Sequence, residues 1–276
     1  MIIDFHTHIF PPQIKEDRSK YIDRDPCFAI LYSDKKARLA TVDELIDSMD
    51  KDGVDVSVVL NIGWTTHELC VETNDYILES INRYPQGFCA VQPRSLGSAL
   101  DEIERCVEGG IRGVGELRPD IQLLDPKDEE VMKPFFEAVN KHNLILLTHT
   151  SEPVGHQYPG KGAITPELIY PFITGYSDSP VVCAHWGGGL PFYALMPEVK
   201  EAISNVFFDT AASPFLYSSQ VYNQVIQLVG ADKVLFGSDY PLLAQSRMLG
   251  EISSLDLPEE TKSLILSGNA RKLLSI

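Results

Sequence analysis

Residues 1–8 read MIIDFHTH, and this stretch joins the pattern of a buried strand to two histidines one residue apart. Residues 2–5 form a short apolar run, typical of a strand covered on both faces. Because side chains alternate along a strand, His6 and His8 should point to the same side, with Asp4 below them and Phe5 and Thr7 facing the helices. Two imidazoles inside a protein are costly to bury unless their nitrogens find partners. A shared metal ion would satisfy both.

Seven further apolar runs follow, each before a segment with helical spacing, as is typical of βα units and a parallel sheet. Strands are predicted over residues 2–5, 54–60, 88–92, 111–115, 144–148, 181–184, 206–208 and 234–237. A capping box formed by Thr41 and Glu44 predicts a helix that Gly53 ends. Further helices are predicted over residues 74–83, 100–108, 129–141, 166–174, 191–204, 218–228 and 259–266.

Eight such units in 276 residues predict an α/β chain with one domain over residues 1–276, a (β/α)8 TIM barrel. Two long connections, 9–40 and 150–165, should leave the C-terminal rim, where the active sites of such barrels lie. The odd number of cysteines, five, has no Cys-x-x-Cys spacing and predicts neither a disulfide framework nor a thiolate metal site.

The formal charge of −16 argues against nucleic acid and anionic membranes as partners. The sequence has no apolar stretch of about 18 residues and no secretory signal at its N-terminus. A cytoplasmic enzyme that acts on a small molecule is therefore expected.

Other predicted strands also end in residues that bind metals. His149 ends the fifth strand in LILLTHT, His185 the sixth in VVCAHWGGG and Asp239 the eighth in VLFGSDYP. The carboxyl ends of barrel strands meet at one rim, so these side chains should gather beside His6 and His8. The pattern predicts a metal site at the C-terminal rim.

These residues resemble the amidohydrolase superfamily, in particular the branch that contains aminocarboxymuconate semialdehyde decarboxylase. The matching motifs are DFHTH, LTHT, AHWGGGLP and GSDYP, and the similarity covers nearly the whole chain. The resemblance implies one divalent metal per chain, usually zinc, bound by His6, His8, His149 and Asp239, with His185 acting near it. Nitrogen and oxygen ligands also accept manganese, iron or cobalt. The resemblance also implies a possible homodimer.

Five further residues are candidates for substrate contacts or for support of the metal ligands. Glu116 ends strand four, where other branches of the superfamily place a bridging ligand between two metals. Arg118 could hold a substrate carboxylate, pair with Glu116 or form a plain salt bridge. Asp209 could fix the tautomer of a ligating histidine or cap a helix. Trp64 and His156 lie in loops and could reach the substrate or be ordinary loop residues.

The expected reaction is hydrolysis of a C–N or C–O acyl bond, in an amide, lactone or cyclic imide, by metal-activated water. Asp239 would accept the proton and His185 would donate to the developing oxyanion. The alternative is non-oxidative decarboxylation of an aromatic or unsaturated carboxylate, which needs a cationic anchor: Arg118, Lys161, Arg18 or Arg38. A barrel that keeps its metal but only binds partners is a third possibility. The compact chain favours hydrolysis.

Overall fold

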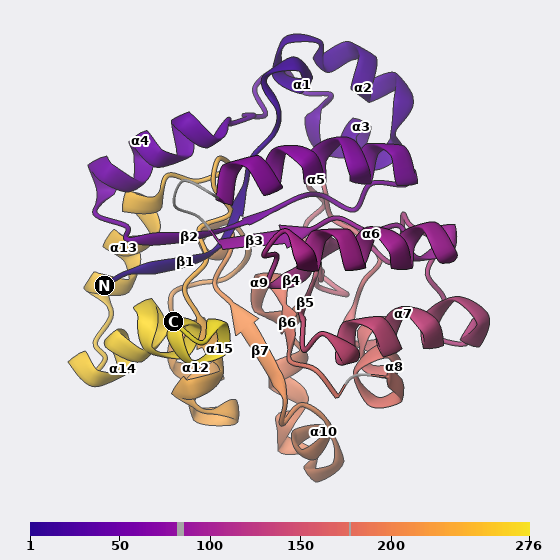
Figure 1. Cartoon of the computed structure of the whole chain (residues 1–276). Helices are drawn as coiled ribbons and strands as arrows, with labels where there is room; N and C mark the ends of the chain where they lie inside the picture. Colours follow the sequence, from indigo (N-terminus) through magenta and orange to yellow (C-terminus); the bar gives the residue numbers. More distant parts are fainter. Residues whose placement is uncertain (82–85, 177) are drawn as a thin grey trace.

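The computed structural model describes residues 1–81, 86–176 and 178–276, and these form a barrel of eight parallel strands (Figure 1). Each strand pairs with the next in sequence order. The last strand returns to the first, since Phe5 N donates to Phe236 O at 2.7 Å and Asp239 N to His6 O at 2.9 Å. The structure confirms the predicted (β/α)8 barrel. The strands are Ile3–His8 (β1), Val56–Leu60 (β2), Gln86–Cys89 (β3), Gly113–Leu117 (β4), Ile145–Thr148 (β5), Val181–Cys183 (β6), Val206–Asp209 (β7) and Val234–Leu235 (β8).

Strand β1 is irregular, and this decides which of its side chains enter the barrel. Between Asp4 and Thr7, β1 has one residue more than the paired segment of β2. Phe5 consequently packs among apolar side chains of β2, β3, β5, β6 and β8 in the barrel interior, whereas Asp4 bonds to residues outside it. The prediction that Asp4 lies below the histidines and that Phe5 faces the helices is wrong. The extra residue interrupts the alternation of side chains along β1. Phe5, His6 and His8 therefore all lie on the interior side of the barrel.

Most predicted helices are present. The helix predicted over residues 191–204 is divided into a 3₁₀ segment (η2, Leu190–Leu195) and α10, because Pro197 occupies the start of a new helix. The end of the helix predicted over 74–83 lies outside the described residues. The helices that match predictions are α4 (Val42–Asp52), α5 (His67–Ile81), α6 (Gly97–Glu108), α7 (Glu129–Lys141), α8 (Pro166–Tyr176), α10 (Pro197–Ala202), α12 (Gln220–Val229) and α14 (Glu259–Ser263).

Helix α4 begins and ends as its sequence predicts. The Thr41 hydroxyl accepts from Glu44 N at 3.4 Å, and the Glu44 carboxylate accepts from Thr41 N at 2.9 Å. Gly53 follows the last turn with φ +74°, a left-handed conformation that glycine adopts without steric cost. Local sequence alone therefore fixes both ends of this helix.

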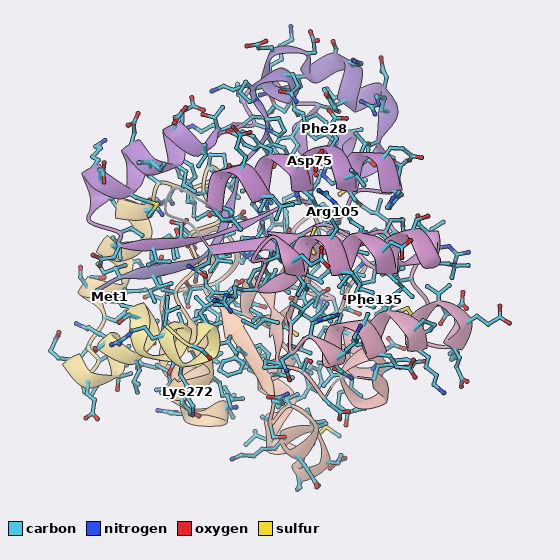
Figure 2. The ribbon with its side chains drawn as sticks, viewed as in Figure 1. Met1, Phe28, Asp75, Arg105, Phe135 and Lys272 are labelled. Carbon is cyan, nitrogen blue, oxygen red and sulfur yellow. The ribbon has the colours of Figure 1, made fainter. Side chains whose placement is uncertain are left out.

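The long connection 9–40 is largely helical and covers one end of the barrel (Figure 1). It contains α1 (Pro12–Glu16), α2 (Arg18–Arg24) and α3 (Pro26–Tyr32). Phe28 of α3, labelled in Figure 2, belongs to a buried cluster with Phe10 and Trp64. These helices escape prediction because they are too short to show a clear periodicity. Other short helices were not predicted either: α9 (Ala184–Gly187), α11 (Ser213–Leu216), α13 (Gln245–Ser254) and α15 (Asn269–Leu274).

The strands are covered by helices on the outside and are packed with apolar side chains inside. Neighbouring helices are linked at the surface, for example by Arg105 of α6 and Asp75 of α5, 2.8 Å apart (Figure 2). Ala270 and Leu274 of α15 extend the interior cluster. All five cysteines are buried and free. In the part of the chain that the structure describes, no helix has the length and apolarity needed to span a membrane.

Candidate metal centre and catalytic site

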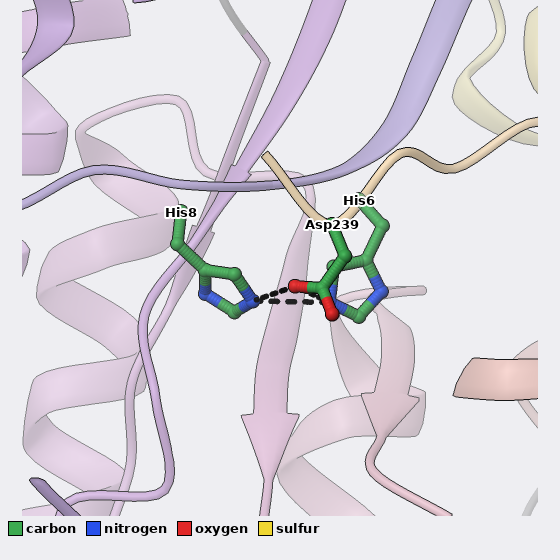
Figure 3. Close-up of side chains that lie close together, drawn as sticks. All are labelled: His6, His8 and Asp239. Carbon is green, nitrogen blue, oxygen red and sulfur yellow. Dashed lines mark hydrogen bonds and ion pairs between the residues drawn. The ribbon is translucent and has the colours of Figure 1, made fainter. Parts of the chain in front are cut away.

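His6, His8 and Asp239 meet at the carboxyl ends of β1 and β8 (Figure 3). The Nε2 atoms of His6 and His8 are 3.0 Å apart. Asp239 Oδ1 lies 3.4 Å from His8 Nε2 and 3.8 Å from His6 Nε2. The imidazole of His6 is fully buried and that of His8 nearly so. Three ligand-type atoms from two distant segments therefore converge on one point.

Asp209, at the end of β7, orients His6. Its Oδ2 lies 2.8 Å from His6 Nδ1, and its Oδ1 accepts from His185 N at 2.9 Å and Ala211 N at 3.0 Å. A carboxylate only accepts, so Nδ1 of His6 carries the proton and Nε2 faces His8 and Asp239. This arrangement prepares a histidine to bind a metal through Nε2. The geometry agrees with the tautomer-fixing role suggested for Asp209.

The donor atoms fit a divalent cation. Ligand atoms about 2.0–2.2 Å from a shared ion lie roughly 3.0–3.6 Å apart in tetrahedral or octahedral geometry, and two of the three separations in this group fall in that range. Two imidazole nitrogens that face each other at 3.0 Å repel unless a proton or a cation lies between them. Among the described residues, the buried His8 Nδ1 has no hydrogen-bond partner.

A buried network holds Asp239 beside β1. Asp4 accepts from the backbone N of Ser238 at 2.9 Å, from its hydroxyl at 2.5 Å and from Gln245 Nε2 of α13 at 2.9 Å. Burial outweighs these hydrogen bonds and raises the pKa of Asp4 to about 6. Asp239 itself has φ +64°, which is uncommon for a residue other than glycine. Asp4 thus ties the turn that carries Asp239 to the strand that carries His6.

Glu116, at the end of β4, lies between the histidines. Its Oε1 is 2.9 Å from His149 Nδ1 and 3.6 Å from His185 Nε2, and its Oε2 is 3.8 Å from His8 Nε2. A second group of possible ligands comprises His6, Glu116 and His185. Glu116 therefore lies among the possible metal ligands, and not only behind them as a residue that supports them.

His149, at the end of β5, lies beside this centre. Its Nδ1 contacts Glu116, and its Nε2 lies 3.1 Å from the hydroxyl of Ser151. His149 belongs to neither group of three mutually close ligand atoms found in the described chain. Its ligand role stays a prediction. Ser151 was not singled out from the sequence, although its place two residues after His149, beyond a strand end, was a usable signal.

His185 lies directly after β6 and has φ +56°, a left-handed backbone. Its Nδ1 lies 3.1 Å from Ala211 O, which can only accept, so Nδ1 donates. The imidazole packs 4.8 Å from that of His149 and 5.4 Å from that of His6, between ring centroids. His185 Nε2 consequently faces the shared centre beside Glu116.

The pKa values of these groups are set by burial and by the charges that are buried beside them. Burial lowers the pKa of His6, but the Asp209 carboxylate outweighs it and raises that pKa to about 10. Burial likewise opposes the charged form of His185, but Glu116 and Asp239 raise its pKa to about 9. Burial would raise the pKa of Asp239, yet His8 and His6 lower it to about 2. Without a metal, protons on histidines supply the positive charge that the buried carboxylates require.

His149 behaves differently from the other histidines. Burial, and after it the positive charge of Arg118, lower the pKa of His149 to about 4. A neutral histidine is the form that binds a metal. Burial would raise the pKa of Glu116, but His149 and other histidines hold it well below its ordinary value.

The remaining candidates occupy different surroundings. Arg118, just beyond β4, is buried and contacts Asp120 at 3.4 Å. Trp64 is fully buried, stacks on Phe28 and donates to Asn61, so it belongs to the core beneath α3. His156 is exposed in the loop 150–165. Neither Trp64 nor His156 joins the cluster of histidines and carboxylates.

Fold and site together define a (β/α)8-barrel enzyme of the metal-dependent class. The family model described as amidohydrolase matches residues 3–276, and the chain belongs to this family. A curated relative, the gamma-resorcylate decarboxylase of Polaromonas sp. (strain JS666 / ATCC BAA-500), is 21% identical over 294 residues, which cover 87% of this chain and 90% of the relative.

Two solved structures extend the comparison. The 5-carboxyvanillate decarboxylase LigW from Sphingomonas paucimobilis has a TM-score of 0.77 at 19% identity, covering 100% of this chain and 99% of that one. The dihydroxybenzoic acid decarboxylase from Polaromonas sp. JS666, solved with manganese and an inhibitor, has a TM-score of 0.74 at 20% identity, covering 99% and 96%. The barrel is therefore similar over its full length.

These comparisons contradict the predicted hydrolysis and agree with the alternative, because the curated relative and both structures are decarboxylases of aromatic acids. The chain was expected to be too compact for a decarboxylase, and this expectation is wrong, because the aligned region covers 99% of the LigW decarboxylase chain. A site of histidines and carboxylates serves either reaction, so the ligand set alone could not separate the two.

Proposed function

We propose that this protein catalyses the metal-dependent, non-oxidative decarboxylation of a small aromatic carboxylic acid. One observation carries the proposal: three histidines and two carboxylates, all at or just beyond strand ends, converge on a buried centre with His149 beside it, in a barrel that resembles such decarboxylases over its full length. The reaction replaces the carboxylate on a ring carbon by a proton and releases carbon dioxide. It therefore needs a group that orients the substrate and a group that delivers a proton.

We propose His6, His8 and Asp239 as the core of the metal site, with His149 and Glu116 beside them. When bound, a divalent cation would orient the acidic substrate and withdraw electron density from its oxygens. Zinc, expected from the sequence, and manganese, which the Polaromonas structure contains, both suit nitrogen and oxygen donors. Metal analysis of purified protein would distinguish them and would give the number of ions per chain.

His185 is the proposed proton donor. Its Nδ1 donates to the carbonyl of Ala211, which fixes the ring and leaves Nε2 directed toward the shared centre. A proton on Nε2 can pass to the ring carbon that bears the carboxylate, after which the carbon–carbon bond breaks. The burial of His185 and of its neighbours excludes water from this transfer.

The test combines carbon dioxide release with isotope labelling. Manganese- or zinc-loaded protein is incubated in deuterium oxide with a panel of hydroxybenzoates, and the product is examined for deuterium at the vacated ring position. We expect stoichiometric release of carbon dioxide and one deuterium per product molecule. Absence of release across the panel with metal-loaded protein would refute the proposed function.

The variant His185→Gln tests the donor. Loss of general acid catalysis should lower kcat by about 10²–10⁴-fold, while the metal content stays that of the wild type. His142→Gln, at the end of α7 and away from the site, is the matched control and should keep full activity. A His185→Gln enzyme with wild-type kcat would remove His185 from the mechanism.

A further inference from the structure

Residues 185–189, directly after β6, form a turn in which every residue has a left-handed backbone. The φ angles are +56° for His185, +59° for Trp186 and between +58° and +92° for the three glycines that follow. Gly188 N donates to His185 O at 3.2 Å and Gly189 N to Trp186 O at 3.1 Å, so hydrogen bonds within the turn close it. Glycine adopts this conformation without steric cost, but His185 and Trp186 do not. The turn therefore needs support from other segments at these two residues.

The support at His185 comes from the segment that follows β7. Asp209 Oδ1 accepts from the backbone N of His185 at 2.9 Å, and Ala211 O accepts from its Nδ1, 3.1 Å away. Asp209 Oδ1 also accepts from Ala211 N at 3.0 Å, so the two acceptors are held together. These bonds fix the peptide and the ring nitrogen of His185, but neither of them holds the residue that comes next in the turn.

Trp186 is held by the same segment after β7. Its indole Nε1 donates to the hydroxyl of Ser213 at 3.0 Å, and Ser213 N donates to Thr210 O at 3.0 Å. The ring of Trp186 meets that of Tyr222 in α12 edge to face, with 4.9 Å between the ring centroids and 86° between the ring planes. Trp186 has no exposed surface and belongs to an apolar cluster with side chains of α12 and α13. The indole is therefore fixed through its N–H as well as through its ring.

The turn also packs tightly against β7 and against the segment that follows β5. A Cβ on Gly187 would lie 2.7 Å from the ring of Phe208 in β7, and a Cβ on Gly188 would lie 2.3 Å from Ser151 O. Close packing on both sides leaves the turn no free space in which to adjust. A shift of Trp186 would consequently be passed on to His185.

We infer that Trp186 is a positioning residue for the proton donor: its hydrogen bond to Ser213 holds the left-handed turn and, with it, the imidazole of His185 in the orientation for proton transfer. The inference rests on the proposed decarboxylation, in which His185 delivers the proton. Trp186 itself transfers no proton. Without its anchor, the turn would relax toward right-handed backbone angles and carry the imidazole with it, and a misplacement of about 1 Å can lower a rate by about 100-fold.

The first test measures the rate of the reaction. Trp186→Phe keeps an aromatic ring but lacks the indole N–H, and Ser213→Ala lacks the acceptor. With manganese-loaded protein and the best substrate of the hydroxybenzoate panel, each variant should lower kcat on the order of 10–100-fold and leave KM within about twofold of the wild type. Metal content should stay that of the wild type, because neither residue is one of the possible metal ligands.

Trp64→Phe is the matched control. Trp64 is also fully buried, and its indole N–H donates to Asn61 at 3.3 Å, outside the cluster of histidines and carboxylates. Trp64→Phe thus removes the same kind of hydrogen bond and should lower the stability to urea as Trp186→Phe does, while kcat stays that of the wild type. A purely structural role of Trp186 would give both variants the same kinetics.

A double variant shows whether the hydrogen bond itself is responsible. Trp186→Phe and Ser213→Ala remove the two partners of one bond. Their effects should therefore not multiply, and the protein with both substitutions should be no slower than the slower single variant.

A measurement without turnover tests the geometry by nuclear magnetic resonance. The chain has two tryptophans, so isotope-labelled, zinc-loaded Trp64→Phe protein shows the indole N–H signal of Trp186 alone. The Nδ1–H of His185, which donates to Ala211 O, is identified as the imidazole signal that His185→Gln removes. We expect Ser213→Ala to shift the indole signal and to abolish the protection of the imidazole N–H from exchange with water.

The inference is overturned by wild-type kcat in Trp186→Phe and Ser213→Ala, by an equal loss of kcat in Trp64→Phe, or by effects that multiply in the double variant. Failure of the proposed function is seen separately, as absence of carbon dioxide release by the wild type. In that case the imidazole signal still decides whether Trp186 positions His185, because a signal that stays unchanged in Ser213→Ala would show that it does not.

Discussion

Single residues set the charge balance of the candidate metal centre. Asp209, Glu116 and Asp239 bring three carboxylates into a region with almost no solvent, and in the metal-free protein protonated His6 and His185 compensate them. A divalent cation would take over this compensation and release protons as it binds. The same side chains therefore couple metal binding, protonation and stability.

Replacement of Asp209 should reveal this coupling in metal-free protein. The folded pKa of His6, about 10, lies above its ordinary value of 6.5, so His6 contributes fully to stability below pH 6.5. This contribution is lost as the pH rises toward 10, with a slope of at most about 1.4 kcal/mol per pH unit for one proton. Asp209→Asn should flatten the slope, as measured by urea unfolding at about pH 7 and pH 9.5.

The exposed Asp232 offers the control for this experiment, and Asp232→Asn should retain the wild-type slope. Equal slopes in wild type and Asp209→Asn would mean that the His6–Asp209 pair does not govern the alkaline loss of stability.

At the scale of elements, local sequence fixes some boundaries and packing fixes others. Helix α4 carries its own start and stop signals, and α7 is found at its predicted bounds. The irregularity in β1 has no local signal, because it arises from how β1 pairs with β2. Prediction by strict alternation therefore placed the histidines correctly but misplaced Phe5 and Asp4.

The capping box of α4 gives a test at this scale. Thr41→Ala removes the acceptor for Glu44 N and should lower the free energy of unfolding by about 1 kcal/mol, with metal content unchanged. Thr41→Ser keeps a hydroxyl at the same place and should restore most of the loss. Thermal or urea unfolding measures both, and a Thr41→Ala protein as stable as the wild type would show that the box contributes nothing.

For the whole molecule, the candidate metal site of His6, His8 and Asp239 joins the first and last strands of the barrel. A ligand that binds the folded state alone adds about 2.7 kcal/mol when its concentration is 100 times its Kd. Chelation should therefore lower the Tm by several degrees, and added Mn²⁺ or Zn²⁺ should restore it.

The variant Asp239→Asn provides the comparison for the chelation experiment. It lacks one negative ligand and should show a much smaller change in Tm on chelation than the wild type. If neither chelation nor added metal changes the Tm of the wild type, no cation stabilises the junction of β1 and β8.

The sequence by itself determined the barrel, its eight strands, the ends of α4 and the gathering of metal-binding residue types at one rim. These follow from short-range patterns: apolar runs, helical spacing and capping residues act over a few positions, and barrel topology then brings strand ends together. His6, His8 and Asp239 could be paired in advance for this reason.

Only the tertiary structure decided the pairings across strands. It placed Glu116 between three histidines, aligned Asp209 with His6, and buried Arg118 beneath two loops. It also packed Trp64 against Phe28 and left His156 exposed in the loop 150–165. Such contacts depend on strand register, on the extra residue in β1 and on how the loops close over the rim. The packing of the whole barrel sets all three. Neighbouring residues in the sequence therefore carry no pattern from which these contacts could be predicted.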